Sequence, residues 1–315
     1  MNRFVLGAGI SGLLWAYYHD DYVVITDDFG RLVTGIDPVV WLNDTDLTRR
    51  LVKDLGLRVE PVEKPIGYKI GDRVLDRIEV ARGDPDFLTS VLDDILLKKM
   101  VPWETLEASR GGQFSVRVRT PSRSLTKDSD VLSYLDVDMS DLVVRLVEAV
   151  TPRICCGQRI EQIDASKMIS ESGSWEYEHI VSTIPAPIFA RIWRGERGLP
   201  RLHWCPVTFV ISNRAPGWWD DRFIVVYDHD LDSPVSRVGR FGRDWRWEFT
   251  GRPDDDTLAD YLPIPNGRFV NPYGRIVQDV RLVSPDPRIL FLGRTAEWDY
   301  RGLIDRTLER VHGRR

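Results

Sequence analysis

The sequence is poor in cysteine and histidine, the side chains that most often bind transition metals. Its 315 residues include three cysteines and five histidines. They form no Cys-x-x-Cys pair and no His-Glu-x-x-His pattern, so the sequence predicts no metal site. Cys155 and Cys156 are adjacent. Because neighbours on a strand point to opposite faces, we expect them to pack near a strand rather than to form a redox pair.

The sequence also lacks a long apolar run and an excess of positive charge. The apolar N-terminus is interrupted at once by Gly7, Gly9 and Gly12, so neither a membrane span nor a signal peptide is predicted, and we expect a cytoplasmic protein. The formal net charge is −5 with both signs interspersed, which does not support a nucleic-acid partner. An apolar content of 43% with 29% charged residues is typical of globular chains. No repeat is present, and no oligomeric state is predicted.

The N-terminus carries a strand, a glycine-rich turn, a helix and a second strand. Arg3–Leu6 and Tyr22–Thr26 have the apolar character of short buried strands, and Leu13–Tyr18 is an apolar helical stretch. Between the first strand and the helix lies a G-x-G-x-x-G turn. Its first glycine allows a tight turn, its second lets the backbone approach a pyrophosphate, and its third lets the helix pack on the strand. The predicted pyrophosphate contacts are Gly7, Gly9, Ile10, Ser11 and Gly12.

An acidic pair follows the second strand. Asp27 stands 20 positions after the first glycine of the turn. At the end of this strand a carboxylate can accept hydrogen bonds from the ribose hydroxyls of an adenosine. Asp28 is the competing candidate for the same role. Together with the glycine turn, these carboxylates predict a dinucleotide-binding unit.

Further elements follow from periodicity and turn residues. Leu47, Leu51 and Leu55 lie on one face of a predicted helix that is stopped by Gly56. Ile289–Leu292 is an apolar strand that leads into Gly293 and Arg294. The other predicted elements are a hairpin over Tyr68–Leu75 turning at Gly71-Asp72, helices over Asp84–Met100, Asp141–Val150 and Leu303–Val311, a polar loop over Arg110–Lys127, and strands over Gln158–Ile163, Ile180–Pro185, Val207–Ile211 and Phe223–Tyr227.

The two ends of the chain resemble a known group of flavoproteins. Val5–Leu13 is similar to the start of the amine oxidase, protoporphyrinogen oxidase and UDP-galactopyranose mutase superfamily. Phe291–Arg294, followed by Trp298, Asp299 and Tyr300, is similar to the C-terminal segment with which the mutases close over FAD. The resemblance implies FAD as the cofactor, and it implies additional FAD contacts from Ile160, Gly293, Arg294, Leu303 and Ile304.

Three internal segments resemble the mutases in particular. They are Gly35–Trp41 with Asn43–Thr45, Ile180–Pro185, and Pro272–Ile276. The last contains Arg275, which the resemblance places on the substrate diphosphate. The planar guanidinium suits phosphate or carboxylate, and a surface residue of a strand is the alternative. Trp298 and Tyr300 occupy the place of two substrate-facing tyrosines, with packing under the flavin as the alternative. The mutases' histidine beside the flavin has no counterpart in Pro38–Trp41, and their uridine-binding insert is much reduced here.

Tryptophans concentrate between residues 204 and 247. They are Trp204, Trp218, Trp219, Trp245 and Trp247. Such residues form either the core and hairpin pairs of a β-rich lobe or an aromatic wall for an amine or a planar substrate. The sequence leaves both interpretations open.

The fold class expected is therefore α/β. It comprises a Rossmann-type FAD-binding domain with a glutathione-reductase-like βαβ unit and a smaller mixed α+β substrate lobe. The domain ranges predicted are 1–80, 141–190 and 265–315 for FAD, and 81–140 and 191–264 for the substrate lobe.

The activity that the resemblance implies is oxidation of a C–N bond in an amine or amino-acid-derived group, by hydride transfer to flavin. The substrate is a small molecule or a nucleotide-linked one. Three alternatives stay open: a non-redox sugar-nucleotide mutase, tailoring of a modified DNA base in a viral pathway, and flavin binding without catalysis.

Overall fold

The computed structural model divides the chain into two compact units. Unit 1 comprises Met1–Glu60, Leu135–Leu202 and Val280–Arg315, and unit 2 comprises Pro61–Tyr134 and His203–Asp279. The described residues are 2–28, 42–76, 79–80, 131–241, 244–262, 267–276, 280, 282–298 and 304–313. The predicted helix over Asp84–Met100 and the predicted loop over Arg110–Lys127 lie outside them.

A parallel sheet forms the centre of unit 1. Its strands are β1 (Arg3–Leu6), β2 (Val23–Ile25), β7 (Ile154–Cys155), β11 (His179–Ser182) and β17 (Ile289–Phe291), in the order β17-β11-β1-β2-β7. From β1 the chain proceeds to β2 and β7 on one side, and later to β11 and β17 on the other. This is a doubly wound arrangement, and its direction reverses between β1 and β11. In such sheets ligands bind outside the carboxyl ends of the strands at that point.

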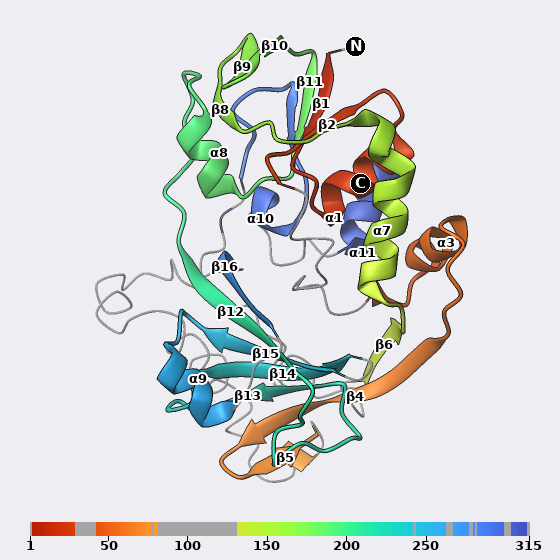
Figure 1. The fold of residues 1–315 in the computed structure, drawn as a ribbon, viewed down its shortest axis with the longest axis vertical. Helices are drawn as coiled ribbons and strands as arrows, with labels where there is room; N and C mark the ends of the chain where they lie inside the picture. The colour runs from red at the N-terminus through yellow and green to blue at the C-terminus, as the bar shows by residue number, and fades with distance from the viewer. Residues whose placement is uncertain are drawn as a thin grey trace. The chain divides into compact units, whose positions relative to one another are not determined.

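Alternate residues of the strands face two different layers. Val5, Val24 and Val181 share one buried cluster with the helices α1 (Ile10–Tyr18), α3 (Asp46–Asp54), α7 (Met139–Val150) and α11 (Ile304–Val311). Phe4, Leu6 and Ile180 share the other cluster with the helices α8 (Ala186–Ile192) and α10 (Arg294–Glu297), and with an antiparallel sheet of β8 (Ile160–Ile163), β9 (Lys167–Ser170) and β10 (Gly173–Glu176). Figure 1 shows the two layers on opposite sides of the parallel strands. Both faces of the sheet are thereby buried, as parallel sheets require. Unit 1 also contains β3 (Leu42–Asn43) and the 3₁₀ turn Thr151–Arg153.

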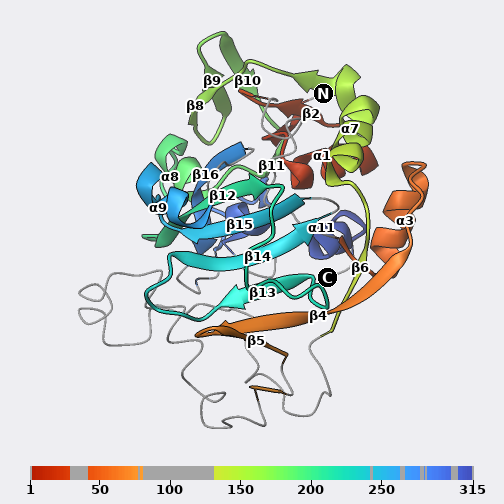
Figure 2. The same cartoon turned by 60° about the horizontal axis from the view of Figure 1, so that its bottom comes forward.

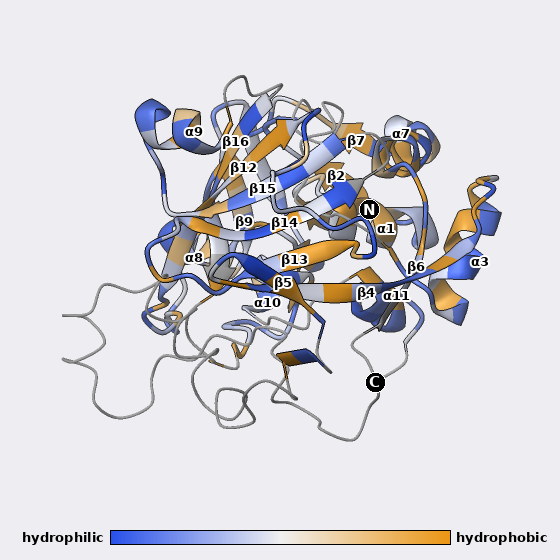
Figure 3. Cartoon of the chain, turned by 90° about the horizontal axis from the view of Figure 1, so that it is seen from below, coloured by the Kyte–Doolittle hydropathy of each residue, from blue (hydrophilic) through white to orange (hydrophobic). Residues whose placement is uncertain are grey.

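Capping side chains and glycines set where several helices begin and end. The Thr45 and Thr48 side chains form a reciprocal capping box at the start of α3, and Gly56 follows its end with a φ of +70°. Figure 3 shows hydrophobic and hydrophilic segments alternating along α3, as the leucine spacing predicts. Helix α1 begins at Ile10, three residues before the predicted Leu13, because the glycine turn itself supplies its first turn. Helix α10 was not predicted, since four residues carry no readable periodicity.

The cysteines differ from expectation in one respect. Cys155 lies on β7, so the prediction of a nearby strand is confirmed, but the side chains of Cys155 and Cys156 are exposed rather than packed. The reason is that β7 is an edge strand of the sheet. Cys205 is buried, and no disulfide links these three cysteines.

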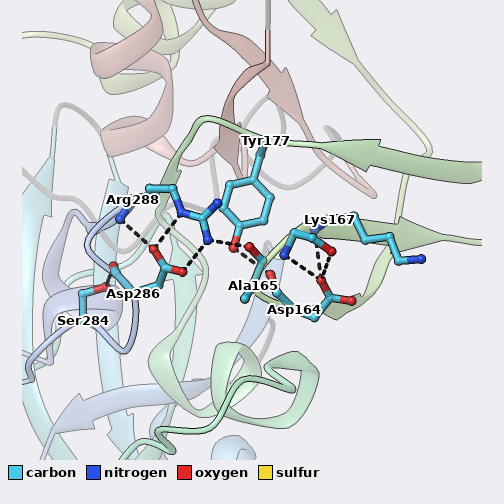
Figure 4. A network of polar contacts seen from close by, with 8 residues as sticks. Asp164, Ala165, Lys167, Tyr177, Ser284, Asp286 and Arg288 are labelled. Carbon is cyan, nitrogen blue, oxygen red and sulfur yellow. Dashed lines mark hydrogen bonds and ion pairs between the residues drawn. The ribbon is translucent and has the colours of Figure 1, made fainter.

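A polar network connects the loop before β17 to the turn between β8 and β9 (Figure 4). Arg288 donates from Nε and Nη2 to the Asp286 carboxylate at 3.1 and 2.7 Å, and Nη2 also donates to the Ala165 carbonyl. The Tyr177 hydroxyl donates to the Asp164 carbonyl at 2.7 Å, and the Arg288 guanidinium lies 4.9 Å from the Tyr177 ring centroid. The hydrogen bonds from Arg288 lower the pKa of Asp286 below its usual value.

We expect Asp286→Asn to make the free energy of unfolding less dependent on pH in the acidic range. A carboxyl whose pKa is lowered in the folded state stabilises the fold above its unfolded pKa of about 3.9, and this contribution is lost as the pH falls through the lowered value. The variant should lose about 1–2 kcal/mol at pH 7, because an ionic hydrogen bond is replaced by a neutral one. Its melting temperature should approach that of the wild type as the pH falls from about 5 to about 2. Equal differences at all pH values would contradict this role, and Asp136→Asn, at an exposed site, is the control.

Unit 2 is built around a mixed sheet. Its strands are β4 (Pro61–Ile70), β5 (Arg73–Leu75), β6 (Val131–Leu135), β12 (Trp204–Ser212), β13 (Val225–Asp228), β14 (Val235–Phe241), β15 (Asp244–Thr250) and β16 (Gly267–Ile276), in the order β16-β12-β15-β14-β13-β4-β6 with β5 paired to β4. The pair β4–β13 is parallel, whereas β12 is antiparallel to both β15 and β16. Figure 2 shows β13, β14 and β15 side by side. The predicted hairpin at Gly71-Asp72 is confirmed, and Gly71 has a φ of +58°.

The tryptophans of unit 2 mainly build its interior. Trp247 is buried in a cluster with Phe249 and Leu258, the latter from α9 (Asp255–Tyr261). Trp218, Trp219 and Trp245 pack against this cluster. Trp204 is exposed beside Tyr273. The core interpretation therefore holds for the group, with Trp204 as the exception.

The division into units departs from the predicted domain ranges. The first segment of unit 1 ends at Glu60 rather than at residue 80, because Pro61–Ile70 forms a strand of the second unit's sheet. The last segment begins at Val280 rather than at residue 265, because Gly267–Ile276 pairs with β12. Both strands belong to unit 2 because they pair with segments that are distant in sequence.

Candidate functional site

The glycine turn lies at the carboxyl end of β1. The Gly7 N–H donates to the Ile25 carbonyl at 2.8 Å, and Gly7 has a φ of +94°. The Thr183 hydroxyl donates to the carbonyls of Leu6 and Gly7 at 2.8 and 3.1 Å. A Cβ on Gly7 would lie 2.9 Å from the Thr183 Oγ1. Glycine is thus needed here for both conformation and space.

Gly9 and Gly12 differ in their surroundings. Gly9 precedes α1 with a φ of −64°, and a Cβ there would meet no atom of the described residues within 4 Å. A Cβ on Gly12 would lie 2.1 Å from the Gly7 carbonyl oxygen and 3.1 Å from the Val5 side chain. Gly12 therefore permits close packing of helix on strand, whereas Gly9 leaves open space in front of the helix.

The start of α1 offers donors to an anion. The first intrahelical hydrogen bond runs from the Leu13 N–H to the Gly9 carbonyl at 2.9 Å. The N–H groups of Ile10, Ser11 and Gly12 precede it and so have no intrahelical acceptor. No side chain caps the helix, and its first turn holds no acidic residue. This arrangement is the one in which helix N-termini bind phosphate.

The C-terminal part of the chain returns to the same point. Beyond β17, the Leu292 N–H donates to the Ser182 carbonyl at 3.0 Å. Gly293 then adopts a φ of +91°, and a Cβ on it would lie 2.5 Å from the Ser11 Oγ. The Ser11 hydroxyl in turn lies 3.4 Å from that of Thr307 in α11. Segments almost 300 residues apart in sequence therefore meet at the N-terminus of α1.

Helix α10 follows Gly293 directly. Arg294 begins this helix, and the Gly293 N–H donates to the Glu297 carboxylate at 3.1 Å. Trp298 ends it with a φ of +56°, the one positive φ of a non-glycine residue among the described residues, and its side chain is 1% exposed. A bulky residue in this conformation is strained and depends on its packing. Such positions often mark functional sites.

The two aspartates after β2 are both exposed. The Thr26 hydroxyl donates to the Asp28 carbonyl at 3.0 Å, and the Gln158 N–H donates to the Thr26 carbonyl at 3.0 Å. These bonds shape the backbone at the end of β2. The choice between Asp27 and Asp28 as the ribose contact stays open.

The remaining predicted residues have varied positions. Ile160 lies on β8 and packs against the cluster that contains Phe4 and Leu6, while Ile304 begins α11 and is buried among the helices of the opposite layer. Arg275 lies on β16 of unit 2, where its backbone pairs with Cys205, and its side chain is outside the described part of the chain. Tyr300 and Leu303, together with Gly35–Trp41, also lie outside the described residues. The roles of all these residues stay predictions.

Sequence reasoning missed the polar residues on the neighbouring elements. Thr183 follows β11 and Thr307 lies in α11. The Ser182 hydroxyl, at the carboxyl end of β11, is fully buried and has no hydrogen-bond partner among the described residues. Ser182 and Thr183 could have been predicted from the sequence. They lie at the end of a predicted strand, and the carboxyl ends of adjacent parallel strands share one edge of the sheet. No such signal exists for Thr307.

Comparison with solved structures gives full-length matches. Cyclohexylamine oxidase from Brevibacterium oxydans is 17% identical, with 99% of this chain and 97% of that chain covered at a TM-score of 0.64. Reduced UDP-galactopyranose mutase is 12% identical, with 98% of this chain and 92% of that chain covered at a TM-score of 0.65. Putrescine oxidase bound to putrescine is 14% identical, with 99% of this chain and 98% of that chain covered at a TM-score of 0.57. The chain has the fold of these oxidases and of this mutase.

This likeness confirms the α/β fold with a parallel and a mixed sheet. It also agrees with the relatives suggested by the motifs at the two chain ends. By sequence alone, no protein-family model and no curated protein matches the chain.

Two kinds of feature are not found among the described residues. No helix among them is long and apolar enough to cross a membrane. No three His, Cys, Asp or Glu side chains of the described part gather as a metal site would require.

Proposed function

We propose that this chain is an FAD-dependent enzyme whose unit 1 is a Rossmann-type, glutathione-reductase-like cofactor domain. The observation that carries the proposal is the approach of Gly293 to Ser11, which brings a second glycine turn against the N-terminus of α1. The N–H groups of Ile10–Gly12 would hold the pyrophosphate together with Gly293 and Arg294, and Asp27 or Asp28 would hold the ribose. The open space at Gly9 and the exposed carboxylates fit this cofactor.

The reaction we propose is oxidation of a C–N bond in an amine or amino-acid-derived substrate. FAD supplies the acceptor for a hydride, while the protein orients the substrate and excludes water. The full-length fold match to two amine oxidases supports this class of substrate. Tyr300 is proposed to face the substrate. The Trp298 side chain is buried, so for this residue we propose packing under the flavin, and its strained backbone supports a role for this segment.

The purified protein should therefore be yellow and should release FAD rather than FMN, since the proposed unit holds an adenosine. Anaerobic addition of candidate amines should bleach the flavin band. Release of FMN, or firm NAD binding without flavin, would refute the cofactor assignment. Yellow protein that no amine bleaches would refute only the proposed substrate class.

A second candidate is a non-redox sugar-nucleotide mutase. It is favoured by the TM-score of 0.65 with reduced UDP-galactopyranose mutase. The two activities differ in the flavin state that they need. A product formed from a sugar nucleotide only after the flavin is reduced beforehand, with no net oxidation, would identify the mutase.

Arg275 is the proposed clamp for an anionic group of the substrate. We expect Arg275→Ala to leave FAD occupancy unchanged and to lower kcat/KM roughly tenfold to hundredfold, because one charge-assisted bidentate contact is worth about 1.5–3 kcal/mol. Arg275→Lys should recover part of the loss, since an ammonium keeps the charge without the planar fork. Steady-state kinetics of the three proteins test this, and equal kinetics would remove Arg275 from the site.

A further inference from the structure

Glu297 contacts the second glycine turn at two points. It is the last residue of α10, one helical turn after Gly293. Its carboxylate accepts a hydrogen bond from the Gly293 N–H at 3.1 Å, and its own backbone N–H donates to the Gly293 carbonyl at 2.8 Å. The N–H and the carbonyl of Gly293 are therefore both bound by the same residue.

An arginine of another helix fixes this carboxylate. The Oε1 atom of Glu297 accepts from Arg310 Nη2 at 2.6 Å, and Arg310 lies in the last turn of α11. The Glu297 side chain is 7% exposed and that of Arg310 is 40% exposed. Hydrogen bonds between charged groups are short and strong, and partial burial strengthens them further. The two oxygens of Glu297 thus connect the turn at Gly293 to α11.

The backbone of Gly293 needs such support. Glycine populates many backbone conformations, so the residue type alone does not keep Gly293 at its φ of +91°. In this conformation Gly293 approaches Ser11 so closely that a Cβ would lie 2.5 Å from the Ser11 Oγ. Helix α11 reaches the same place, because the Thr307 hydroxyl lies 3.4 Å from that of Ser11. The contacts of Glu297 therefore join elements that meet at the N-terminus of α1.

Two roles are open to the carboxylate. It could occupy the Gly293 N–H in place of a phosphate and be displaced when the cofactor binds, or it could hold the turn in place throughout. Displacement would break the bond to Gly293 and disturb a mostly buried ion pair with Arg310. Disrupting a buried charge in this way is costly. The burial and the ion pair therefore favour the second role.

We propose that Glu297 is a positioning residue for FAD. Its carboxylate, paired with Arg310, keeps Gly293 in the conformation that closes the second turn on the pyrophosphate at α1, and Glu297 itself does not contact the cofactor. This inference rests on the proposed function. If the competent conformation is populated to only about one tenth, the apparent Kd rises about tenfold although every direct contact remains possible.

Substitutions of Glu297 should therefore change the affinity for FAD. Glu297→Ala removes the carboxylate and should raise the Kd of FAD about tenfold or more. Glu297→Gln keeps an oxygen acceptor on a side chain of equal length and should recover part of the loss. Arg310→Met keeps an apolar stem and should raise the Kd about threefold, since the arginine is partly exposed. Titration of the flavin-free proteins with FAD, followed by flavin fluorescence, measures these values.

The matched control is Glu309→Ala, which removes an exposed glutamate of α11. It should leave the Kd of FAD unchanged. Circular dichroism and the melting temperature of the flavin-free proteins confirm that each variant is folded.

Hydrogen exchange separates positioning from a general loss of packing. In the flavin-free protein, the peptide that contains Gly293 should exchange faster in Glu297→Ala than in the wild type, because the Gly293 N–H loses its acceptor. Peptides from β1 and α7 should exchange as in the wild type. Glu297→Gln should give an intermediate rate for the Gly293 peptide.

Four results would overturn the inference. They are a wild-type Kd in folded Glu297→Ala, unchanged exchange of its Gly293 peptide, faster exchange throughout unit 1, and tighter FAD binding, which a displaceable carboxylate would produce. A wild-type protein that binds no FAD would contradict the proposed function and this inference with it. Normal FAD binding by both the wild type and Glu297→Ala would contradict this inference alone.

Discussion

Gly9→Val is expected to fold normally and to purify without the yellow colour of bound flavin. Gly9 has a φ of −64°, which valine adopts readily, and within the described part of the chain a Cβ there would meet no atom within 4 Å. The space that the side chain would fill is the space proposed for the pyrophosphate. Loss of two hydrogen bonds to the charged phosphates, at about 1.5–3 kcal/mol each, would weaken FAD binding at least about 100-fold.

The measurement is flavin content per chain together with the melting temperature of the flavin-free proteins. Gly198→Val is the matched control, because Gly198 is exposed and likewise has open space around its Cβ position. The control should keep its flavin. Wild-type flavin content in a folded Gly9→Val protein would place the cofactor elsewhere.

Gly12→Ala is expected to destabilise unit 1 itself. Its Cβ would lie 2.1 Å from the Gly7 carbonyl oxygen, a backbone atom that cannot move alone. Overpacking of this kind costs about 1–3 kcal/mol and occasionally more. At about 2–4 °C per kcal/mol for domains of 150–250 residues, the melting temperature of the flavin-free protein should fall by several degrees.

Gly9→Ala serves as the comparison for Gly12→Ala, because it adds the same methyl group three residues earlier at an open position. The two variants should therefore separate stability from cofactor binding. An unchanged melting temperature in flavin-free Gly12→Ala would show that α1 does not pack on β1 as closely as described.

Much of unit 1 near the N-terminus could be predicted because its signals are local. The three glycines have distinct roles within six residues, and each role follows from a conformation or a contact that the neighbouring strand and helix impose. The helix over Asp46–Asp54 follows from its leucine spacing and from Gly56. In unit 2, the hairpin at Gly71-Asp72 likewise depends on turn residues alone.

Other features could not be predicted because they depend on pairing between distant segments. Pro61–Ile70 joins the sheet of unit 2 through parallel pairing with Val225–Asp228, about 160 residues away in sequence. The edge position of β7 exposes Cys155 and Cys156, although the residues themselves are apolar enough to be buried. The hydrogen bonds of Arg288 to Asp286 and Ala165 likewise depend on how the layers pack.

The sequence by itself determined the dinucleotide-binding pattern, the order of the main elements and the second glycine turn near the C-terminus. These features are encoded within short windows, where backbone freedom, periodicity and capping act. Only the tertiary structure decided that Gly293 lies against Ser11, that Thr307 reaches the same hydroxyl, and that Arg310 binds the Glu297 carboxylate. The physical reason is that burial of both faces of a sheet selects among many long-range pairings, and no short window of sequence contains that choice.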